Sequence, residues 1–320
     1  MLVIMYDVIC VGILVADAMA KPVNQIPEKG KLALVDAITL FTGGCAVNAA
    51  IDMSKIGLDI AIAGKVGNDG FGQFMRSELK TYQVNADALV VDKKASTSAS
   101  LVISNADGER SFIHSLGANA LFCEEDINYD IVKKSGIVFV AGSLLMPQFD
   151  GNGCAVFLEK CKEMGKTTAL DTAWDSLGGW MNILAPAMPF IDYFLPSYEE
   201  AVQLSGKTEL EEIADVFLAM GPKTVVIKNG KKGCFIKTKS GEKLTIPTFE
   251  RIKPVDTNGA GDSFCAGFLT GLARKWNLYE CGRFANAVGT HCIMEAGAST
   301  GIKSEGEILK FIKDYEKGIV

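Results

Sequence analysis

The sequence has little histidine, tryptophan and proline, and no pair of cysteines with the spacing Cys-x-x-Cys. Its 320 residues include 2 histidines, 3 tryptophans and 9 prolines. Two histidines without a Cys-x-x-Cys pair exclude the usual zinc-binding constellations. The nine cysteines are an odd number in no disulfide pattern. We therefore expect reduced, mostly buried thiols and a cytoplasmic location.

Positive charge is also scarce. The chain has 32 Lys and Arg residues against 38 Asp and Glu residues, a net charge of −6, and no run of basic residues. Binding a polyanion needs a basic surface, so nucleic acid and anionic membranes are not expected partners. The apolar N-terminus lacks a basic segment and is interrupted by Asp7 and Asp17, which predicts a buried strand over about 7–14 and not a signal peptide. No stretch reaches the ~18 apolar residues of a membrane span.

What the chain does contain is an alternation of short apolar runs and amphipathic segments in its second half. These patterns predict strands at 136–142, 167–171, 192–197 and 224–228, and helices near 153–164, 198–205, 209–220, 261–275 and 279–295. Continuous apolar strands separated by helices are typical of an α/β fold with a mostly parallel sheet and helices on both faces.

Two segments, about 14–40 and 88–114, differ from this pattern. They contain β-prone, half-polar stretches, and the pair Asp107-Gly108 predicts a hairpin turn in the second. No repeat or low-complexity linker separates them from the rest. We expect one domain over 1–320, in which these two inserted segments form a small β-sheet that stands off the main body as a lid.

The stretch DTNGAGDSFCAGF, which begins at Asp256, places three small residues directly before Asp262: Gly259, Ala260 and Gly261. The apolar residues that follow have helical spacing, so a helix begins here. A helix start without bulky side chains exposes backbone N–H groups to an anion such as phosphate. A carboxylate beside them is useful as a general base that deprotonates an attacking hydroxyl. The competing hypothesis is a tight turn in which the acid only favours the helix dipole.

Two other phosphate-binding motifs are excluded. A P-loop needs a glycine five residues before Gly-Lys-Ser/Thr, and Lys160 and Ala201 stand at those positions. The stretch GAGDSF ends in Phe264, where a dinucleotide fingerprint has Gly or Ala.

Together with a second motif, this stretch resembles the signatures of the ribokinase-like carbohydrate kinases, also called the phosphofructokinase B family. The second motif is GGCAVNAAIDMSKIGLDIAIAGKVG over 43–67, with Asn48, Gly57 and Gly67 at the family's spacings. The resemblance covers essentially the whole chain. It implies a Rossmann-like ribokinase fold with a small β-sheet lid, and ATP-dependent, Mg²⁺-requiring phosphorylation of a hydroxyl of a small carbohydrate.

The resemblance also implies roles for individual residues. Asp262 corresponds to the catalytic base, and Gly259, Ala260 and Gly261 form its anion hole. The implied acceptor-binding residues are Asp17, Gly43, Gly44 and Asn48, and Arg110 is a lid residue that can reach the acceptor. The implied ATP-binding residues are Ser197, Lys228, Gly230, Gly233, Gly259, Gly261 and Asn286.

Two cation sites are implied as well. Glu200 corresponds to the acid that organises Mg²⁺ through water, although Ser197 replaces the family's asparagine three residues before it. A monovalent cation, with K⁺ as the expected activator, is implied beside the anion hole at Asp256 and at the carbonyl groups of Asn258, Cys292, Glu295, Gly297 and Gly301.

The acceptor side departs from ribokinase itself, because Val15 and Cys45 replace an asparagine and a lysine. Strict ribose specificity is therefore not expected. Few basic residues flank the acceptor motifs, which favours an uncharged sugar or polyol over a sugar phosphate. A nucleoside kinase of the same fold is the second hypothesis, and a non-catalytic sugar or nucleotide sensor is the third. Exposed lid strands need covering, so a homodimer is expected.

Overall fold

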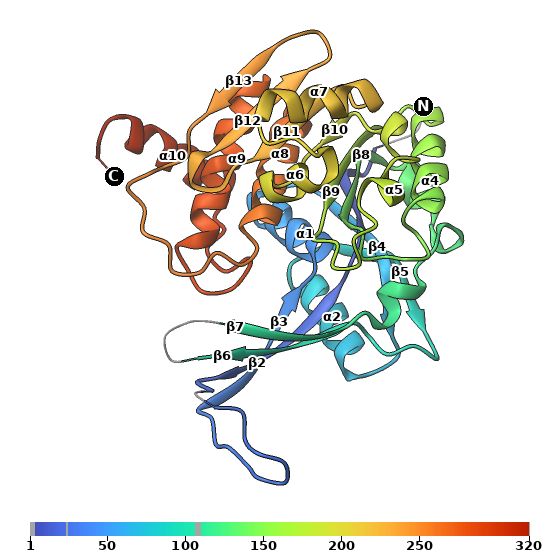
Figure 1. The fold of residues 1–320 in the computed structure, drawn as a ribbon, viewed down its shortest axis with the longest axis vertical. Helices are drawn as coiled ribbons and strands as arrows, with labels where there is room; N and C mark the ends of the chain where they lie inside the picture. Colours follow the sequence, from blue (N-terminus) through green and yellow to red (C-terminus); the bar gives the residue numbers. More distant parts are fainter. Residues whose placement is uncertain (1–3, 24, 106–109, 320) are drawn as a thin grey trace.

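A nine-stranded sheet runs through the centre of the chain (Figure 1). The computed structural model describes residues 4–23, 25–105 and 110–319. The strand order is β13-β12-β11-β10-β9-β8-β1-β4-β5, and every pair from β11 to β5 is parallel, whereas β12 and β13 are antiparallel. The strands are β1 (Tyr6–Gly12), β4 (Ile60–Gly67), β5 (Asn85–Asp92), β8 (Ser135–Ser143), β9 (Thr167–Thr172), β10 (Tyr193–Phe194), β11 (Thr224–Lys228), β12 (Cys234–Thr238) and β13 (Lys243–Ile246).

Helices cover both faces of this sheet. One face packs against α1 (Cys45–Ile56), α2 (Gly70–Thr81), α8 (Ala260–Ala273), α9 (Leu278–Ile293) and α10 (Glu305–Glu316). The other packs against α3 (Tyr129–Lys133), α4 (Asn152–Glu163), α5 (Met181–Leu184), α6 (Tyr198–Ser205) and α7 (Leu210–Met220). Short 3-10 helices are η1 (Gly117–Leu121), η2 (Glu124–Asp126), η3 (Met188–Phe190) and η4 (Gly230–Lys232).

The central strands are apolar throughout because both of their faces are buried. In β1, Val8 and Cys10 join the core under α1 and α8, whereas Ile9 and Val11 join the core under α4 and α7. All four side chains are fully buried. This arrangement confirms the predicted α/β class with a mostly parallel sheet and helices on both faces.

The expected elements of the second half are present, with one shortened. The strand predicted over 192–197 covers only Tyr193–Phe194. Two residues later Pro196 cannot donate a ladder hydrogen bond, and Ser197 already caps α6. None of the described helices is long and apolar enough to cross a membrane.

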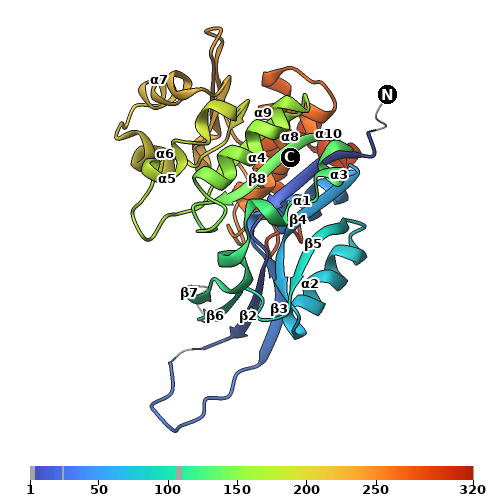
Figure 2. The same cartoon turned by 90° about the vertical axis from the view of Figure 1, so that its right-hand side faces the viewer.

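A second, four-stranded sheet projects from the main body in both side views (Figures 1 and 2). Its order is β3-β2-β6-β7, and its strands are β2 (Val15–Lys21), β3 (Ala37–Gly43), β6 (Ala99–Ser104) and β7 (Arg110–Ser115). Residues 88–92 pair with β4 in the large sheet, so the second inserted segment begins later than its expected start at 88. The expected turn at Asp107-Gly108 lies outside the described residues.

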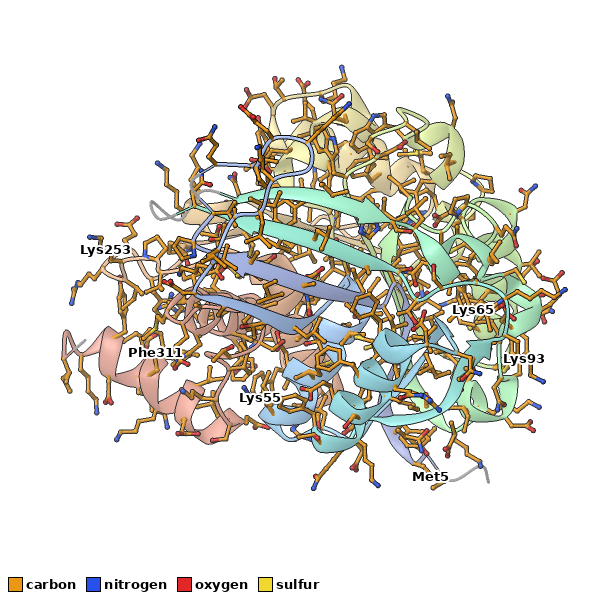
Figure 3. The ribbon with its side chains drawn as sticks, turned by 90° about the horizontal axis from the view of Figure 1, so that it is seen from below. Met5, Lys55, Lys65, Lys93, Lys253 and Phe311 are labelled. Atoms are coloured by element: carbon orange, nitrogen blue, oxygen red, sulfur yellow. The ribbon has the colours of Figure 1, made fainter. Side chains whose placement is uncertain are left out.

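The two faces of the small sheet differ in character. The register aligns Phe41, Asp17, Ser100 and His114 in one cross-strand row, and Thr39, Met19, Val102 and Phe112 in the next. The opposite face carries Ile38, Leu40, Leu101 and Ile113, which are 72%, 40%, 56% and 60% exposed. Figure 3 shows the strands of this sheet side by side, viewed from below.

Candidate active site

The start of α8 is built so that only a glycine fits before it. Gly259 caps the helix with φ of 76°, and a Cβ there would lie 2.6 Å from the Cβ of Ala298. Asp262, in the first turn, accepts a 2.8 Å hydrogen bond from Asn48 Nδ2 on α1. The carboxylate is thereby fixed beside the free N–H end of the helix.

Burial controls the protonation of Asp262. Its partly buried position raises the pKa of the carboxyl group, while Asn48, the Lys228 ammonium and the Cys45 thiol act to lower it. A carboxylate with a raised pKa is a stronger proton acceptor than an exposed one. These are the properties of a general base.

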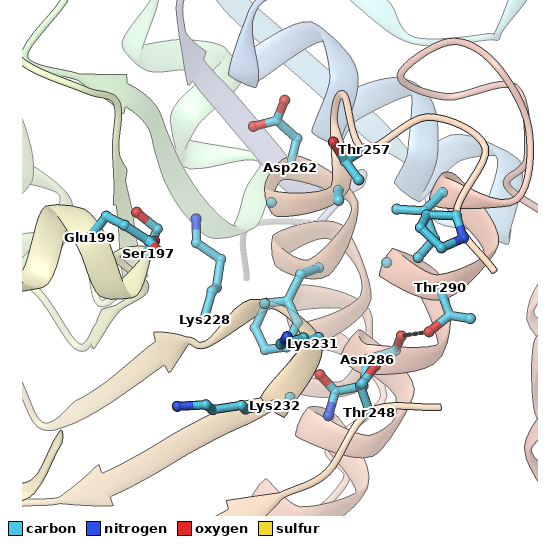
Figure 4. A pocket seen from close by; sticks show the side chains of 18 of the residues that line it. Ser197, Glu199, Lys228, Lys231, Lys232, Thr248, Thr257, Asp262, Asn286 and Thr290 are labelled. Carbon is cyan, nitrogen blue, oxygen red and sulfur yellow. Dashed lines mark hydrogen bonds between the residues drawn. The ribbon is translucent and has the colours of Figure 1, made fainter. Parts of the chain in front are cut away.

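A cleft of about 1020 Å³, called the donor cleft below, opens beside this helix start. It lies over the carboxyl ends of β9 and β11, where open α/β sheets bind ligands. Most of the residues predicted to bind ATP line it: Ser197, Lys228, Gly230, Gly233, Gly261 and Asn286. Figure 4 shows Lys228 and Asp262 facing the same space between α6 and α8, with Asn286 deeper along α9. Gly259 caps the helix just outside this lining.

Ser197 and Glu200 form a capping box at the start of α6. The N–H of Ser197 donates to Glu200 Oε2 at 3.0 Å, and the Thr172 hydroxyl donates to the same oxygen at 3.0 Å. Among the described residues, no group of three or more His, Cys, Asp or Glu side chains is arranged to hold a metal. Glu200 lines the cleft without a cluster of other ligating side chains around it, an arrangement that fits Mg²⁺ held largely by water and phosphate oxygens.

The far wall of the cleft is fixed by Asn286 and two glycines. The Asn286 amide donates to the carbonyl groups of Ile246 at 3.0 Å and Pro247 at 3.3 Å. Gly233 has φ of 87°, and a Cβ there would lie 2.0 Å from the Ile246 oxygen. Gly230 has φ of 51° and faces open space. The amide nitrogen of Asn286 therefore joins α9 to the end of β13 and stabilises this wall of the cleft.

The residues of the expected monovalent-cation site lie together behind α8. Asp256 accepts from the N–H groups of Asn258 at 3.0 Å and Gly297 at 2.9 Å. The Cys292 thiol contacts two carbonyl oxygens, those of Asn258 at 3.2 Å and Ala298 at 3.1 Å.

Two further glycine and carbonyl positions complete this cluster. A Cβ at Gly301 would lie 2.1 Å from the His291 oxygen and 3.4 Å from the Cys292 oxygen. The Glu295 carboxylate instead pairs with Lys303 at 3.1 Å, which leaves only its backbone for a cation. Carbonyl oxygens of Asn258, His291, Cys292 and Ala298 thus lie among these residues, and carbonyl oxygen is a donor type that a hard cation accepts.

A second cavity, called the lid cavity below, has a volume of about 500 Å³. It lies between the small sheet and the residues Asn258, Gly297 and Ala298. Asp17, Met19, Phe41 and Phe112 line one side, and Asn258, Gly297 and Ala298 line the other. Burial raises the pKa of Asp17, whereas Ser100 and His114 act to lower it.

Two glycines allow the Asp17 carboxylate to sit where it does. A Cβ at Gly43 would lie 2.2 Å from Asp17 Oδ2, and Gly44 has φ of 93° with the Ile13 carbonyl 2.5 Å from its missing Cβ. Asn48 does not line this cavity; it is 4% exposed and donates to Asp262. The side chain of Arg110 lies outside the described part of the chain.

Sequence reasoning missed Asp171 and Cys265, which contact the predicted Lys228. Asp171 lies one residue before the end of β9 and pairs with Lys228 at 2.6 Å, and the Cys265 thiol donates to the same carboxylate at 3.4 Å. The available signal was an acid at the carboxyl end of an apolar parallel strand, the position at which such sheets present functional groups.

Comparison with known proteins assigns the chain to a family. A family model described as "pfkB family carbohydrate kinase" matches residues 5–305. A probable fructokinase of Arabidopsis thaliana is 27% identical over 312 residues, which cover 92% of this chain and 96% of the relative. A nucleoside kinase of Methanothermobacter thermautotrophicus is 27% identical over 287 residues, which cover 90% and 89%.

Solved structures show the same architecture over almost the whole chain. A ribokinase of Arabidopsis thaliana complexed with ribose and ATP superposes with a TM-score of 0.85 at 24% identity, covering 96% of this chain and 99% of that one. A ribokinase from Thermotoga maritima superposes with a TM-score of 0.83 at 25% identity, with the same coverage. The chain has their fold, including the second small sheet.

Proposed function

Since the chain belongs to the pfkB family of carbohydrate kinases, we propose that it transfers the γ-phosphoryl group of ATP to a hydroxyl of a small, uncharged sugar or sugar-like polyol. One observation carries the proposal. Asp262 is held by Asn48 at the bare start of α8, in contact with a large cleft and next to the wall of the lid cavity.

The reaction divides among the chain's own residues. Asp262 takes the proton of the acceptor hydroxyl as its oxygen bonds to phosphorus and the bond to the ADP oxygen breaks. The N–H groups at the start of α8 stabilise the charge on the group in transfer. Asp17 holds neighbouring hydroxyls of the acceptor. Glu200 would hold Mg²⁺ through water, and that ion would neutralise charge on the phosphates. Asp256 and the neighbouring carbonyl groups would hold K⁺.

The charges around the lid cavity support an uncharged acceptor. Its described lining includes two acids, Asp17 and Asp36, and one cation, Lys21. A protein that binds a phosphorylated sugar supplies Arg or Lys to its dianion. The net charge of the chain gives no compensating attraction.

A nucleoside is the second candidate acceptor. The inner face of the small sheet presents Met19, Phe41, Val102 and Phe112 to the same cavity as Asp17. A hydroxyl-binding acid beside an apolar and aromatic wall suits a molecule with a sugar at one end and a planar base at the other. Relatives of both kinds are similar to this chain, a probable fructokinase and a nucleoside kinase.

We also propose that two copies pair through their small sheets. The outer face carries Ile38, Leu40, Leu101 and Ile113, all exposed. A contiguous apolar sheet face on a single chain is a site of association, and a second identical sheet is the simplest partner under two-fold symmetry.

The test is an acceptor screen with coupled detection of ADP. Free hexoses, pentoses, polyols and nucleosides are compared by kcat/KM with fructose 6-phosphate and tagatose 6-phosphate, and Asp262→Asn protein serves as the control for contaminating kinases. A free sugar or polyol should give the highest value. A sugar phosphate that is better by tenfold or more would overturn the proposed acceptor, and a nucleoside at the top would select the second candidate.

A further inference from the structure

The ion pair between Lys228 and Asp171 lies at the floor of the donor cleft. Lys228 Nζ lies 2.6 Å and 2.7 Å from the two carboxylate oxygens of Asp171. The side chains are 11% and 2% exposed. Removing two charges from water costs several kcal/mol per ion, and apolar residues of similar size often stabilise a fold as well. Stability alone is therefore a weak reason for this pair.

The lysine is directed toward the start of α8. A Cβ at Gly261 would lie 3.6 Å from Lys228 Nζ, so the ammonium stands beside the first turn that bears Asp262. Its backbone forms a parallel bridge with Ser197 at the start of α6. Figure 4 shows its amine between Ser197 and Asp262.

The surroundings keep this amine charged. Burial alone would lower the pKa of Lys228, but the carboxylates of Asp171 and Glu200 outweigh burial and raise that pKa above its ordinary value. Cys265 packs against both members of the pair, 3.7 Å from the ammonium and 3.4 Å from the carboxylate. Asp171 and Cys265 thus hold the ammonium group in one position, although it ends a flexible side chain.

We propose that Lys228 is a catalytic residue that binds the phosphoryl group in transfer, and that Asp171 is the positioning residue that aims it. The inference rests on the proposed kinase function. As the acceptor oxygen bonds to phosphorus and the bond to ADP breaks, charge on the transferring oxygens is met by the N–H groups of α8 on one side and the ammonium on the other. Lys228 keeps its proton throughout, and Asp262 receives the hydroxyl proton.

The chain's own departure at Ser197 supports this role. The Ser197 hydroxyl accepts from the Glu200 N–H in the capping box. It offers a phosphate a single O–H donor, on a side chain with a shorter reach than an asparagine. A fixed lysine next to it supplies a charge-assisted bond to phosphate, which is about twice as strong as a neutral one.

The first test uses nucleotide binding without any acceptor. Calorimetry compares the Kd values of ATP and ADP in the presence of Mg²⁺ for the unaltered protein, Lys228→Met and Lys228→Arg. The preference for ATP over ADP should fall about tenfold in Lys228→Met, the size of one lost charged hydrogen bond, and recover in part in Lys228→Arg. Lys239→Met removes the same charge from an exposed lysine beyond the far end of β12 and should leave the preference unchanged.

The second test uses turnover with the best acceptor. In Lys228→Met, kcat should fall roughly 10²–10³-fold with a smaller change in the KM of the acceptor, as for other lost transition-state donors. Asp171→Asn should also lower kcat in the unaltered protein, but it should have little further effect in a Lys228→Met background, because it acts through the lysine. Replacing both members leaves no unpaired buried charge, so this double variant also tests whether loss of activity is loss of fold.

The outcomes separate this proposal from the proposed function. If Lys228→Met changes the ratio of the Kd values of ADP and ATP by less than twofold, the proposed role of the lysine is wrong, even if the protein phosphorylates sugars. A preference that depends on Lys228, in a protein that phosphorylates none of the acceptors screened, would support the lysine and reject the acceptor. Equal losses of kcat from Asp171→Asn with and without Lys228 would reject the positioning role.

Discussion

Replacing the buried Asp52 should change how the stability of the protein depends on pH. Asp52 lies one helical turn after Asn48 on α1 and is fully buried. The Ser263 hydroxyl donates to its Oδ2, and its Oδ1 has no hydrogen-bond partner among the described residues. Burial raises the pKa of this carboxyl group to about 7, while Ser263 and the nearby Lys55, labelled in Figure 3, act to lower it.

The size and sign of the effect follow from proton linkage. An unfolded Asp has a pKa of about 3.9, so between about pH 4 and pH 7 the folded state holds a proton that the unfolded state has lost. This contribution to stability is present at low pH and is lost as the pH rises through the folded value. From pH 5 to pH 8 the free energy of unfolding should therefore decrease by about 2.5 kcal/mol from this one group.

Asp52→Asn removes the titration and keeps the shape of the side chain. Urea unfolding at pH 5, 6, 7 and 8 should show the variant gaining on the unaltered protein by about 2.5 kcal/mol across that range. Asp130→Asn, which removes an exposed acid in α3, is the matched control and should run parallel to the unaltered protein. Parallel curves for Asp52→Asn would refute the reasoning, as would an equal gain by the control.

Four other results are expected. Asp262→Asn should lower kcat by roughly 10² or more while ATP binding by calorimetry persists, and near-full turnover would contradict its role as base. Glu200→Ala should raise the Mg²⁺ concentration needed for half-maximal rate, and an unchanged requirement would remove it from the metal site. K⁺ in place of Na⁺ should increase the rate through the loop of Asp256, whereas a flat response argues against the cation site. Leu101→Asp with Ile113→Asp should convert a dimer to monomers by light scattering, and an unaltered protein that is monomeric at micromolar concentration excludes lid pairing.

The fold was predictable where the signal is local. The apolar strands at 136–142 and 224–228 differ from their flanking helices in period and composition, so each could be recognised on its own. The boundary between the large and small sheets could not. Residues 85–92 and 99–104 are both half-polar strands, and only the tertiary pairing of the first with β4 assigns it to the large sheet.

The motifs of the candidate site could be recognised in the sequence, whereas the contacts among their residues could not. The signatures pointed to Asn48 and Asp262, 214 positions apart, but not to the hydrogen bond between them. Asp171 and Lys228 are 57 positions apart on strands that are not direct neighbours, because β10 lies between β9 and β11. Whether two such residues meet depends on how far each strand extends in the folded sheet, and spacing in the sequence does not determine this.

The charges of the donor cleft explain why a lysine has to be held in place there. The described lining contains five acids, Asp171, Glu199, Glu200, Glu250 and Asp262, and three lysines, Lys228, Lys231 and Lys232. Lys231 and Lys232 are exposed on η4, where solvent screens them. A nucleoside triphosphate is itself an anion, so a cleft of this composition repels it unless cations enter with it or stand within contact distance of its phosphates. Under the proposed function, Mg²⁺ would meet the first condition, and the buried ammonium of Lys228, beside the free N–H groups of α8, would meet the second. Asp171 would then have a reason to be buried, because it holds the ammonium of Lys228 beside the start of α8 through both carboxylate oxygens.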